Sequence, residues 1–146
     1  MKIVIKEIKD LKFAEYNPRK LTNKDHSDLK TSLEKFGMVE PIVVNRNENR
    51  INVIIGGHQR CRIWKEFGHR KIPCVEFDLN IDQEKELNIR LNKNVGSWDH
   101  DMLANMFNVD DLFEYGFEEK ELIGFFSPDD DDIDQQSKEK CEHCGK

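Results

Sequence analysis

The sequence predicts an α+β fold, α/β-like in the order of its elements, with a small mixed sheet, flanking helices and a short helical C-terminal extension. Apolar spacing and turn residues give the order strand, helix, strand, strand, helix, strand, helix. The 146 residues are 37% hydrophobic, which allows one modest core and leaves part of the chain outside it.

The N-terminal segment predicts a strand, a loop and a helix. The strand covers residues 2–8, and Pro18 marks the loop because it lacks a backbone donor. Thr22 can cap the helix, Asp25 completes a variant of the capping box, and Gly37 ends the helix. Its buried face is predicted from apolar residues at helical spacing: Leu29, Leu33 and Phe36.

The middle of the chain predicts a hairpin, a helix, a further strand and a further helix. Asn47-Glu48-Asn49 is the turn of the hairpin, and Gly68 ends the helix that follows Gly56 and Gly57. Leu87 and Leu91 are expected to face inward from the last helix. The predicted strands are 42–45, 51–55 and 72–77, and the predicted helices end near Phe67 and span 82–94.

Three parts are expected along the chain: a domain over 1–96, a helical extension over 97–127 and an acidic disordered tail over 128–146. Short helices at 99–107 and 118–125 would form the extension. They would pack around seven apolar residues: Met102, Leu103, Met106, Phe107, Phe113, Phe117 and Leu122. For the Phe-rich segment of this extension, ordinary packing is favoured over a partner-docking surface; its members are Phe107, Phe113, Phe117, Phe125 and Phe126.

Charge and apolar patterning limit the function classes. The net charge is −6, of which residues 128–146 carry −4, so a nucleic-acid surface would have to be a local patch. No apolar run approaches a membrane span, and the charged N-terminus lacks a signal-peptide core. We therefore expect a cytoplasmic protein without a membrane partner, whose cysteines stay reduced.

The stretch IIGGHQRCRIWKEFGH combines a glycine turn with a basic helix start. Gly56 and Gly57 permit unusual backbone angles and leave no side chain to block a ligand. A helix N-terminus attracts anions, and Arg60 in its first turn can offer a fork of donors to a phosphate. Residues 56–71 carry five bases and one acid. Spacing alone leaves two interpretations open, a phosphate site and a structural turn.

GGHQR resembles the second signature box of the ParB/sulfiredoxin superfamily, in the form of the phage-type ParB-like N-terminal (ParB-like nuclease) domain. NPR, LKTSLEKFGMVEPIVVN and LNKNVGSWDHDMLANMF resemble further family segments in the same order, over residues 1–107. The resemblance implies a ParB/sulfiredoxin-like fold. It also implies a DNA-associated module that binds a nucleotide or a nucleic-acid phosphate, in phage or mobile-element DNA processing, partitioning or regulation.

The resemblance also implies site residues. Gly57, Arg60 and Arg62 match the phosphate box, whereas His58 and Gln59 replace its acid and first arginine. Asn92 matches a later asparagine, and Leu91 stands where the family has a glutamate. The implied ligand is a nucleoside triphosphate with magnesium. The nucleotide- or phosphate-binding set is Gly56, Gly57, His58, Gln59, Arg60, Arg62, Asn17, Arg19 and Asn92.

Alternative functions remain open. A ParB-like nuclease, or a nucleotide-dependent kinase or hydrolase, would use His58 as general base, with Glu15 or Asp78 replacing the missing carboxylate. A ligand-free adaptor would work through the Phe-rich extension or the cysteine tail. Sulfinic-acid repair is not expected, because His58 replaces the sulfiredoxin cysteine and Cys61 is expected in the core beside Trp64. Expected partners are DNA or a nucleotide, a DNA-processing protein such as a methyltransferase or terminase, and a second copy in a homodimer.

The C-terminal CEHCGK places Cys141 and Cys144 in a C-x-x-C pair. A structural zinc site needs four ligands, and no second pair stands at suitable spacing. The pair is half of a zinc site completed by another chain, the remnant of a zinc ribbon whose other half is missing, or a reduced, flexible tail.

Overall fold

The computed structural model describes residues 1–93 and 96–123. Its contacts divide the chain into two units, residues 1–96 and 97–146. Each unit has its own apolar core. In the described part, no helix is long and apolar enough to cross a membrane.

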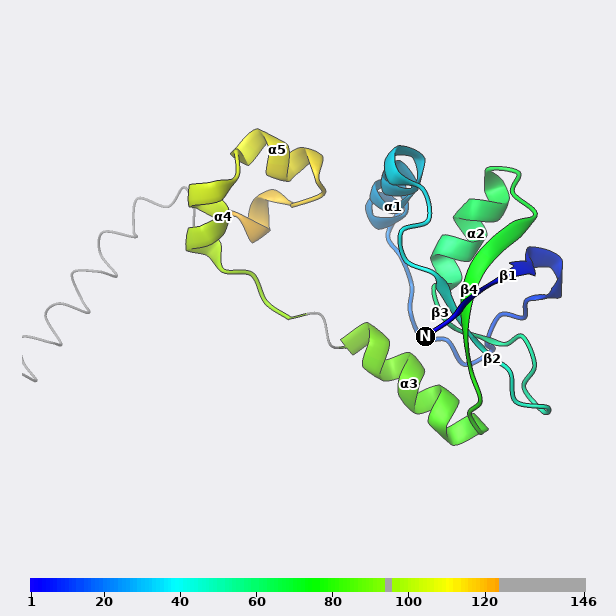
Figure 1. Ribbon diagram of the computed structural model, residues 1–146. Helices are drawn as coiled ribbons and strands as arrows, with labels where there is room; N and C mark the ends of the chain where they lie inside the picture. Colours follow the sequence, from blue (N-terminus) through cyan, green and yellow to red (C-terminus); the bar gives the residue numbers. More distant parts are fainter. Residues whose placement is uncertain (94–95, 124–146) are drawn as a thin grey trace, which may run out of the picture. The chain divides into compact units, whose positions relative to one another are not determined.

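The first unit is built on a four-stranded mixed sheet, as the sequence predicts (Figure 1). The spatial order is β1-β4-β2-β3. β4 runs antiparallel to β1 and parallel to β2, and β2 and β3 form the antiparallel hairpin. The strands are β1 (Ile3–Glu7), β2 (Ile42–Asn45), β3 (Ile54–Gly56) and β4 (Lys71–Phe77).

Three helices accompany this sheet: α1 (Asn23–Phe36), α2 (His58–Glu66) and α3 (Ile81–Lys93). α1 packs against α2, α2 against β2 and α3 against β3 (Figure 1). Both bonds of the predicted capping box are present at Thr22 and Asp25, and Gly37 ends α1 with φ 74°. A short 3-10 helix, η1 (Ile8–Asp10), follows β1.

Eight buried residues form the core of the first unit, and Trp64 packs against them. The expectation that Cys61 lies in the core beside Trp64 is confirmed. The eight residues are Ile8, Leu11, Ile42, Val44, Ile54, Cys61, Ile72 and Cys74.

Two predicted inward faces are wrong in part. Leu33 of α1 is buried as predicted, but Phe36 is 74% exposed. On α3, Leu91 is 47% exposed, while Glu84 and Asn88 are fully buried. This helix attaches to the rest of the unit by polar bonds as well as by apolar packing.

The return strand of the hairpin begins later than predicted, at Ile54 instead of residue 51. Asn52 adopts a left-handed φ of 62°, and Asn47 accepts a hydrogen bond from the Asn49 N–H at 3.0 Å. These asparagines hold a wide turn by bonding locally to the backbone. Arg50 leaves this turn to reach Glu84 on α3.

The second unit contains α4 (His100–Met106), α5 (Val109–Glu114) and the 3-10 helix η2 (Glu119–Glu121) (Figure 1). α5 is an addition to the prediction. Of the helix expected over 118–125, residues 118–123 are described, and they contain the 3-10 helix η2. The core consists of Leu103, Leu112 and Leu122, with Phe117 against it. The expected packing is therefore wrong for four exposed side chains: Met102, Met106, Phe107 and Phe113. Cys141, Cys144 and the acidic run lie outside the described residues.

Candidate functional site

The backbone between β3 and α2 strongly favours glycine at position 57. Gly57 has φ 92° and ψ 23° in the left-handed region. A Cβ there would lie 2.6 Å from Ile42 Cδ1 and 2.9 Å from Arg60 Nη2. In the described structure no side chain caps α2 at this residue, so its first N–H groups remain available to another partner.

A pocket opens at this helix start. It is formed by the loop before α1, by α1 itself, by the beginning of α2 and by the end of α3. All predicted phosphate-binding residues except Arg62 line it. The lining consists of Asn17, Arg19, Leu21, Leu29, Gly56, Gly57, His58, Gln59, Arg60 and Asn92.

Arg60 is the arginine of α2 that reaches this pocket. Its Nη1–H donates to Glu40 Oε2 at 3.0 Å, and its Nη2–H donates to the Pro41 carbonyl at 3.4 Å. Its buried Nε has no hydrogen-bond partner in the described structure. Burial lowers the pKa of Arg60, Glu40 opposes this, and Arg19 adds to it. A guanidinium that is partly desolvated and incompletely bonded favours an incoming anion.

A ladder of amides joins the other pocket residues to the sheet. Arg19 Nη1–H donates to Asn92 Oδ1 at 2.9 Å, and Asn92 Nδ2–H donates to the Asn88 carbonyl at 2.7 Å. Asn88 Nδ2–H donates to the Ile55 carbonyl at 2.8 Å and to Asn17 Oδ1 at 3.5 Å. The ladder therefore ties the N-terminal loop, α3 and β3 together.

His58 is held in a structural arrangement. It is 5% exposed, and its Nε2 accepts a hydrogen bond from the Ala14 N–H at 3.3 Å. Burial, assisted by Arg62, lowers the pKa of His58 to about 4. The imidazole is therefore neutral at pH 7, with one nitrogen already engaged by the backbone, and this geometry does not favour the general-base role.

Four residues that the sequence analysis considered for this site do not line the pocket. Arg62 lies over the Phe13 ring, with Cζ 4.8 Å from the centroid. Glu15 is exposed, and Asp78 accepts a hydrogen bond from Asn47, so neither supplies a carboxylate to the pocket. Leu91 lies beside the glycines, with its Cδ1 3.0 Å from the position of a Cβ on Gly56.

A metal has little to bind here. The pocket lining contains no carboxylate. Over residues 1–93 and 96–123, no group of three His, Cys, Asp or Glu side chains could hold an ion. Magnesium at this pocket would have to be held chiefly by ligand phosphates and water.

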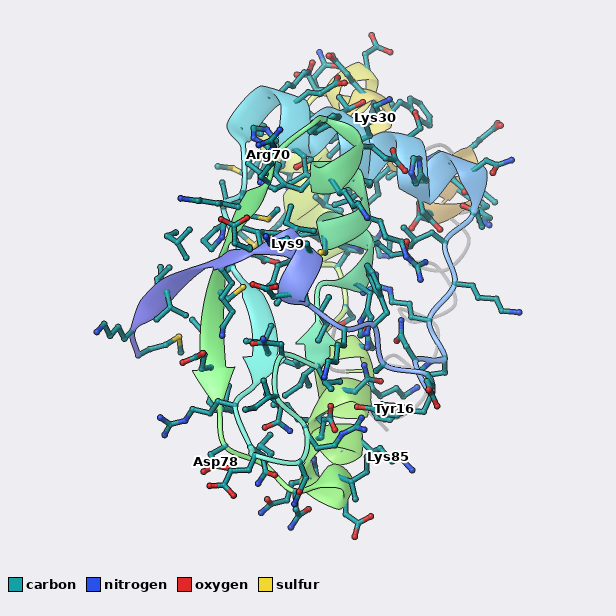
Figure 2. The ribbon with its side chains drawn as sticks, turned by 90° about the vertical axis from the view of Figure 1, so that its right-hand side faces the viewer. Lys9, Tyr16, Lys30, Arg70, Asp78 and Lys85 are labelled. Carbon is teal, nitrogen blue, oxygen red and sulfur yellow. The ribbon has the colours of Figure 1, made fainter. Side chains whose placement is uncertain are left out.

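Sequence reasoning missed two fully buried polar residues of α3, Glu84 and Asn88. Glu84 is fully buried and accepts a hydrogen bond from Arg50 Nε at 2.8 Å. Burial, and then Glu84, raise the pKa of Tyr16 to about 12 (Tyr16 is labelled in Figure 2). Glu84, Asn88 and Asn92 are spaced by four on α3. That polar stripe is the signal that could have revealed a polar helix face turned inward.

Residues 2–95 match the family model of the ParB N-terminal domain. The chain belongs to the ParB N-terminal domain family. Within this domain, the glycine box lies at the strand-to-helix junction from which the pocket opens.

Two curated relatives resemble this ParB N-terminal domain in sequence. The probable chromosome-partitioning protein ParB of Campylobacter jejuni subsp. jejuni is 30% identical over 90 residues, which cover 61% of the chain and 31% of the relative. An uncharacterized protein, ORF326b, of Acidianus two-tailed virus is 27% identical over 81 residues, which cover 55% of the chain and 24% of the relative. The chain thus spans a quarter to a third of these relatives.

Solved structures show the same fold at low identity. C-terminally truncated ParB from Caulobacter crescentus, complexed with CTP-gamma-S, has a TM-score of 0.61 at 18% identity, covering 84% of this chain and 75% of that one. The same protein complexed to the centromeric parS site has a TM-score of 0.51 at 20% identity, and the match covers 68% of this chain and 56% of that one. Sulfiredoxin from Arabidopsis thaliana has a TM-score of 0.50 at 16% identity, and the match covers 60% of this chain and 97% of that one. These likenesses confirm the ParB/sulfiredoxin fold.

Proposed function

We propose that this ParB N-terminal domain binds a nucleoside triphosphate, with its phosphates at the start of α2. The observation that carries the proposal is Arg60, whose buried Nε has no hydrogen-bond partner among residues 1–93 and 96–123 and lies beside an uncapped helix start. A phosphate at this point would accept hydrogen bonds from the guanidinium and from the first N–H groups of α2.

The other pocket residues suit the rest of a nucleotide. Arg19 adds a second cation, and the amide of Asn92 holds it in place. Leu21 and Leu29 add apolar surface. We name CTP as the first ligand to test because the Caulobacter crescentus structure holds CTP-gamma-S. Magnesium would arrive with the phosphates, since the lining offers no carboxylate.

Titration calorimetry with the four nucleoside triphosphates, with and without magnesium, tests the proposal. Arg60→Ala should weaken binding at least about tenfold, because charge-assisted hydrogen bonds contribute about 1.5–3 kcal/mol each. Arg62→Ala is the matched control, since Arg62 lies over Phe13 and outside the pocket, and it should leave binding unchanged. Absence of binding to every nucleotide, or equal effects of the two substitutions, would contradict the proposal.

Glu40→Gln gives a change in the opposite direction. Glu40 is an exposed carboxylate that pairs with Arg60 at 3.0 Å, so a phosphate has to compete with it. Removing its charge should tighten nucleotide binding several-fold. Glu48→Gln removes an exposed charge outside the pocket and should have no effect. Weaker binding by Glu40→Gln would mean that the phosphates lie elsewhere.

The wider role follows from the relatives. The name of the Campylobacter jejuni relative supports a DNA-associated function in partitioning. The viral source of the other relative supports a setting in phage or mobile-element DNA. Binding is favoured over catalysis, because His58 is engaged with Ala14 and the pocket lacks a carboxylate. A phosphate-release assay with CTP separates the two. Turnover that is lost in His58→Gln, while nucleotide binding is retained, would instead favour the enzyme.

A further inference from the structure

A second surface, away from the nucleotide pocket, combines stacked aromatic rings with exposed cations. The rings are those of Trp64, Phe67 and His69, at the C-terminal end of α2 and in the turn before β4. We call this set the aromatic platform.

The aromatic platform is rigid because its base is anchored. Trp64 packs against the core of the first unit, and its Nε1–H donates to the Lys71 carbonyl at 3.1 Å. Gly68, with φ 90°, turns the chain so that His69 folds back onto the indole. The imidazole and indole rings lie 3.9 Å apart at 10°, and Phe67 meets both rings edge-on. His69 remains exposed, so an added planar group can extend the stack.

Basic side chains surround this stack. Lys30 Nζ lies 6.0 Å from the Phe67 ring centroid, and Arg70 follows His69 directly. Lys9 is close by, because the neighbouring Ile8 N–H donates to the Arg70 carbonyl at 2.8 Å. Figure 2 labels Lys9, Lys30 and Arg70 around α2.

These cations have no carboxylate partner in the described part of the chain. Lys9, Lys30 and Arg70 are exposed and form no ion pair there. Glu66 is the acid on this part of α2, and its Oε2 lies 3.8 Å from Nε2 of His26 instead of pairing with one of these three cations. Residues 1–96 carry 19 Lys and Arg against 14 Asp and Glu, a net of +5, so this unit is basic within an acidic chain.

We propose that the aromatic platform and its three cations bind single-stranded nucleic acid. An unpaired base would stack on the exposed face of His69, and the flanking phosphates would lie against Lys30 and Arg70. Stacking on an aromatic side chain together with backbone neutralisation is the general mode of single-strand recognition. A duplex keeps its bases stacked inside and would engage only the cations.

Fluorescence anisotropy of the full-length protein with a short labelled oligo-dT, and with a duplex of equal length, tests this inference. His69→Ala should weaken single-strand binding at least about fivefold and leave duplex binding unchanged. His69→Phe retains an aromatic face and should preserve binding. The double variant Lys30→Ala with Arg70→Ala should weaken single-strand binding. It should also reduce the steepness of log K plotted against log salt concentration by about 1.4, because two phosphates would no longer be neutralised.

The control variant removes the same charge elsewhere. Arg46→Ala with Lys85→Ala deletes two exposed cations outside the aromatic platform, and it should retain single-strand binding (Lys85 is labelled in Figure 2). Arg60→Ala should also retain it, which separates this surface from the nucleotide pocket. The inference is overturned by absence of single-strand binding at low salt, by equal loss in the control, or by unchanged binding in His69→Ala.

Discussion

Gly57 and Gly68 share a left-handed backbone conformation, but glycine is favoured at the two positions for different reasons. Both have φ near 90° and both border α2. A Cβ on Gly57 would collide with Ile42 Cδ1, whereas a Cβ on Gly68 would meet nothing within 4 Å. At Gly57 both lack of space and backbone strain disfavour a side chain, and at Gly68 strain alone does so.

Alanine substitutions should separate these two effects. Gly68→Ala should lower the free energy of unfolding by about 1–2 kcal/mol, the strain of a left-handed residue. Gly57→Ala adds overpacking against Ile42, so we expect a total of about 2–4 kcal/mol. Urea unfolding at pH 7 measures both changes. Equal losses would show that Ile42 moves aside without resistance.

The depressed pKa of His58 links stability to pH. The folded pKa is about 4 and the ordinary value is 6.5, so below pH 6.5 the unfolded chain binds a proton that the folded protein resists. Stability is complete above pH 6.5 and falls as the pH drops toward 4. Between pH 7 and 4.5, the His58 contribution to the free energy of unfolding should decrease by about 2 kcal/mol.

Urea unfolding of the protein and of His58→Gln, across this pH range, isolates that contribution. The Gln amide oxygen can still accept the Ala14 N–H but does not titrate in this range, so the variant should have a flatter profile. A profile of His58→Gln that matches the parent would mean that other groups cause the loss.

At the scale of elements, the sequence predicted α1 well because its signals are local. The capping box at Thr22 and the glycine at position 37 act within a few residues of the helix ends. The inward face of α3 depended on partners more than 30 residues away, since Asn88 bonds to the Ile55 carbonyl and Glu84 to Arg50. Apolar periodicity on its own therefore selected Leu91, which is exposed.

The residues of the candidate pocket were predicted from a family resemblance. The order of the NPR, GGHQR and LNKN segments resembled a known family, and the structure brings Asn17, Arg60 and Asn92 to one cavity. Arg62 was misplaced because a helix turns by about 100° per residue. Two residues beyond Arg60, its side chain therefore points to another side of α2 and lies over Phe13.

The amide ladder should set how firmly α3 is attached. Asn88→Ala leaves the Ile55 carbonyl without its 2.8 Å partner and should lower the free energy of unfolding by about 1–3 kcal/mol. Ile89→Ala, which truncates a 51% exposed neighbour, is the control and should change it by less than about 0.5 kcal/mol. Chemical denaturation compares them. An unchanged free energy of unfolding in Asn88→Ala would show that the amide ladder does not stabilise the fold.

At the scale of the whole molecule, charge changes sign where the contacts divide the chain. Residues 1–96 have a net charge of +5, and the remaining 50 residues carry 4 bases against 15 acids, a net of −11. The overall value of −6 therefore hides a basic unit. The long-range field of the acidic segment should oppose polyanions that approach the basic one.

Residues 1–96 expressed alone should fold and behave as a cation. Their core is made entirely of residues from this unit, so cooperative unfolding should persist. At pH 7 and low salt, the fragment should bind a cation exchanger, whereas the full chain should bind an anion exchanger. Circular dichroism with ion-exchange chromatography checks both outcomes. A fragment without a cooperative transition would show that the first unit needs residues beyond 96.

The strand order also determines when the sheet can be completed during synthesis. β4 lies between β1 and β2, and Ile3 pairs with Val75. The ribosome therefore releases the first strand several seconds before its partner, at about 5–20 residues per second. During that time the β2–β3 hairpin can form from neighbouring residues, whereas β1 has no strand to pair with. Insertion of β4 joins β1 to the β2–β3 hairpin, so the sheet of the nascent domain cannot be completed before β4 is synthesised.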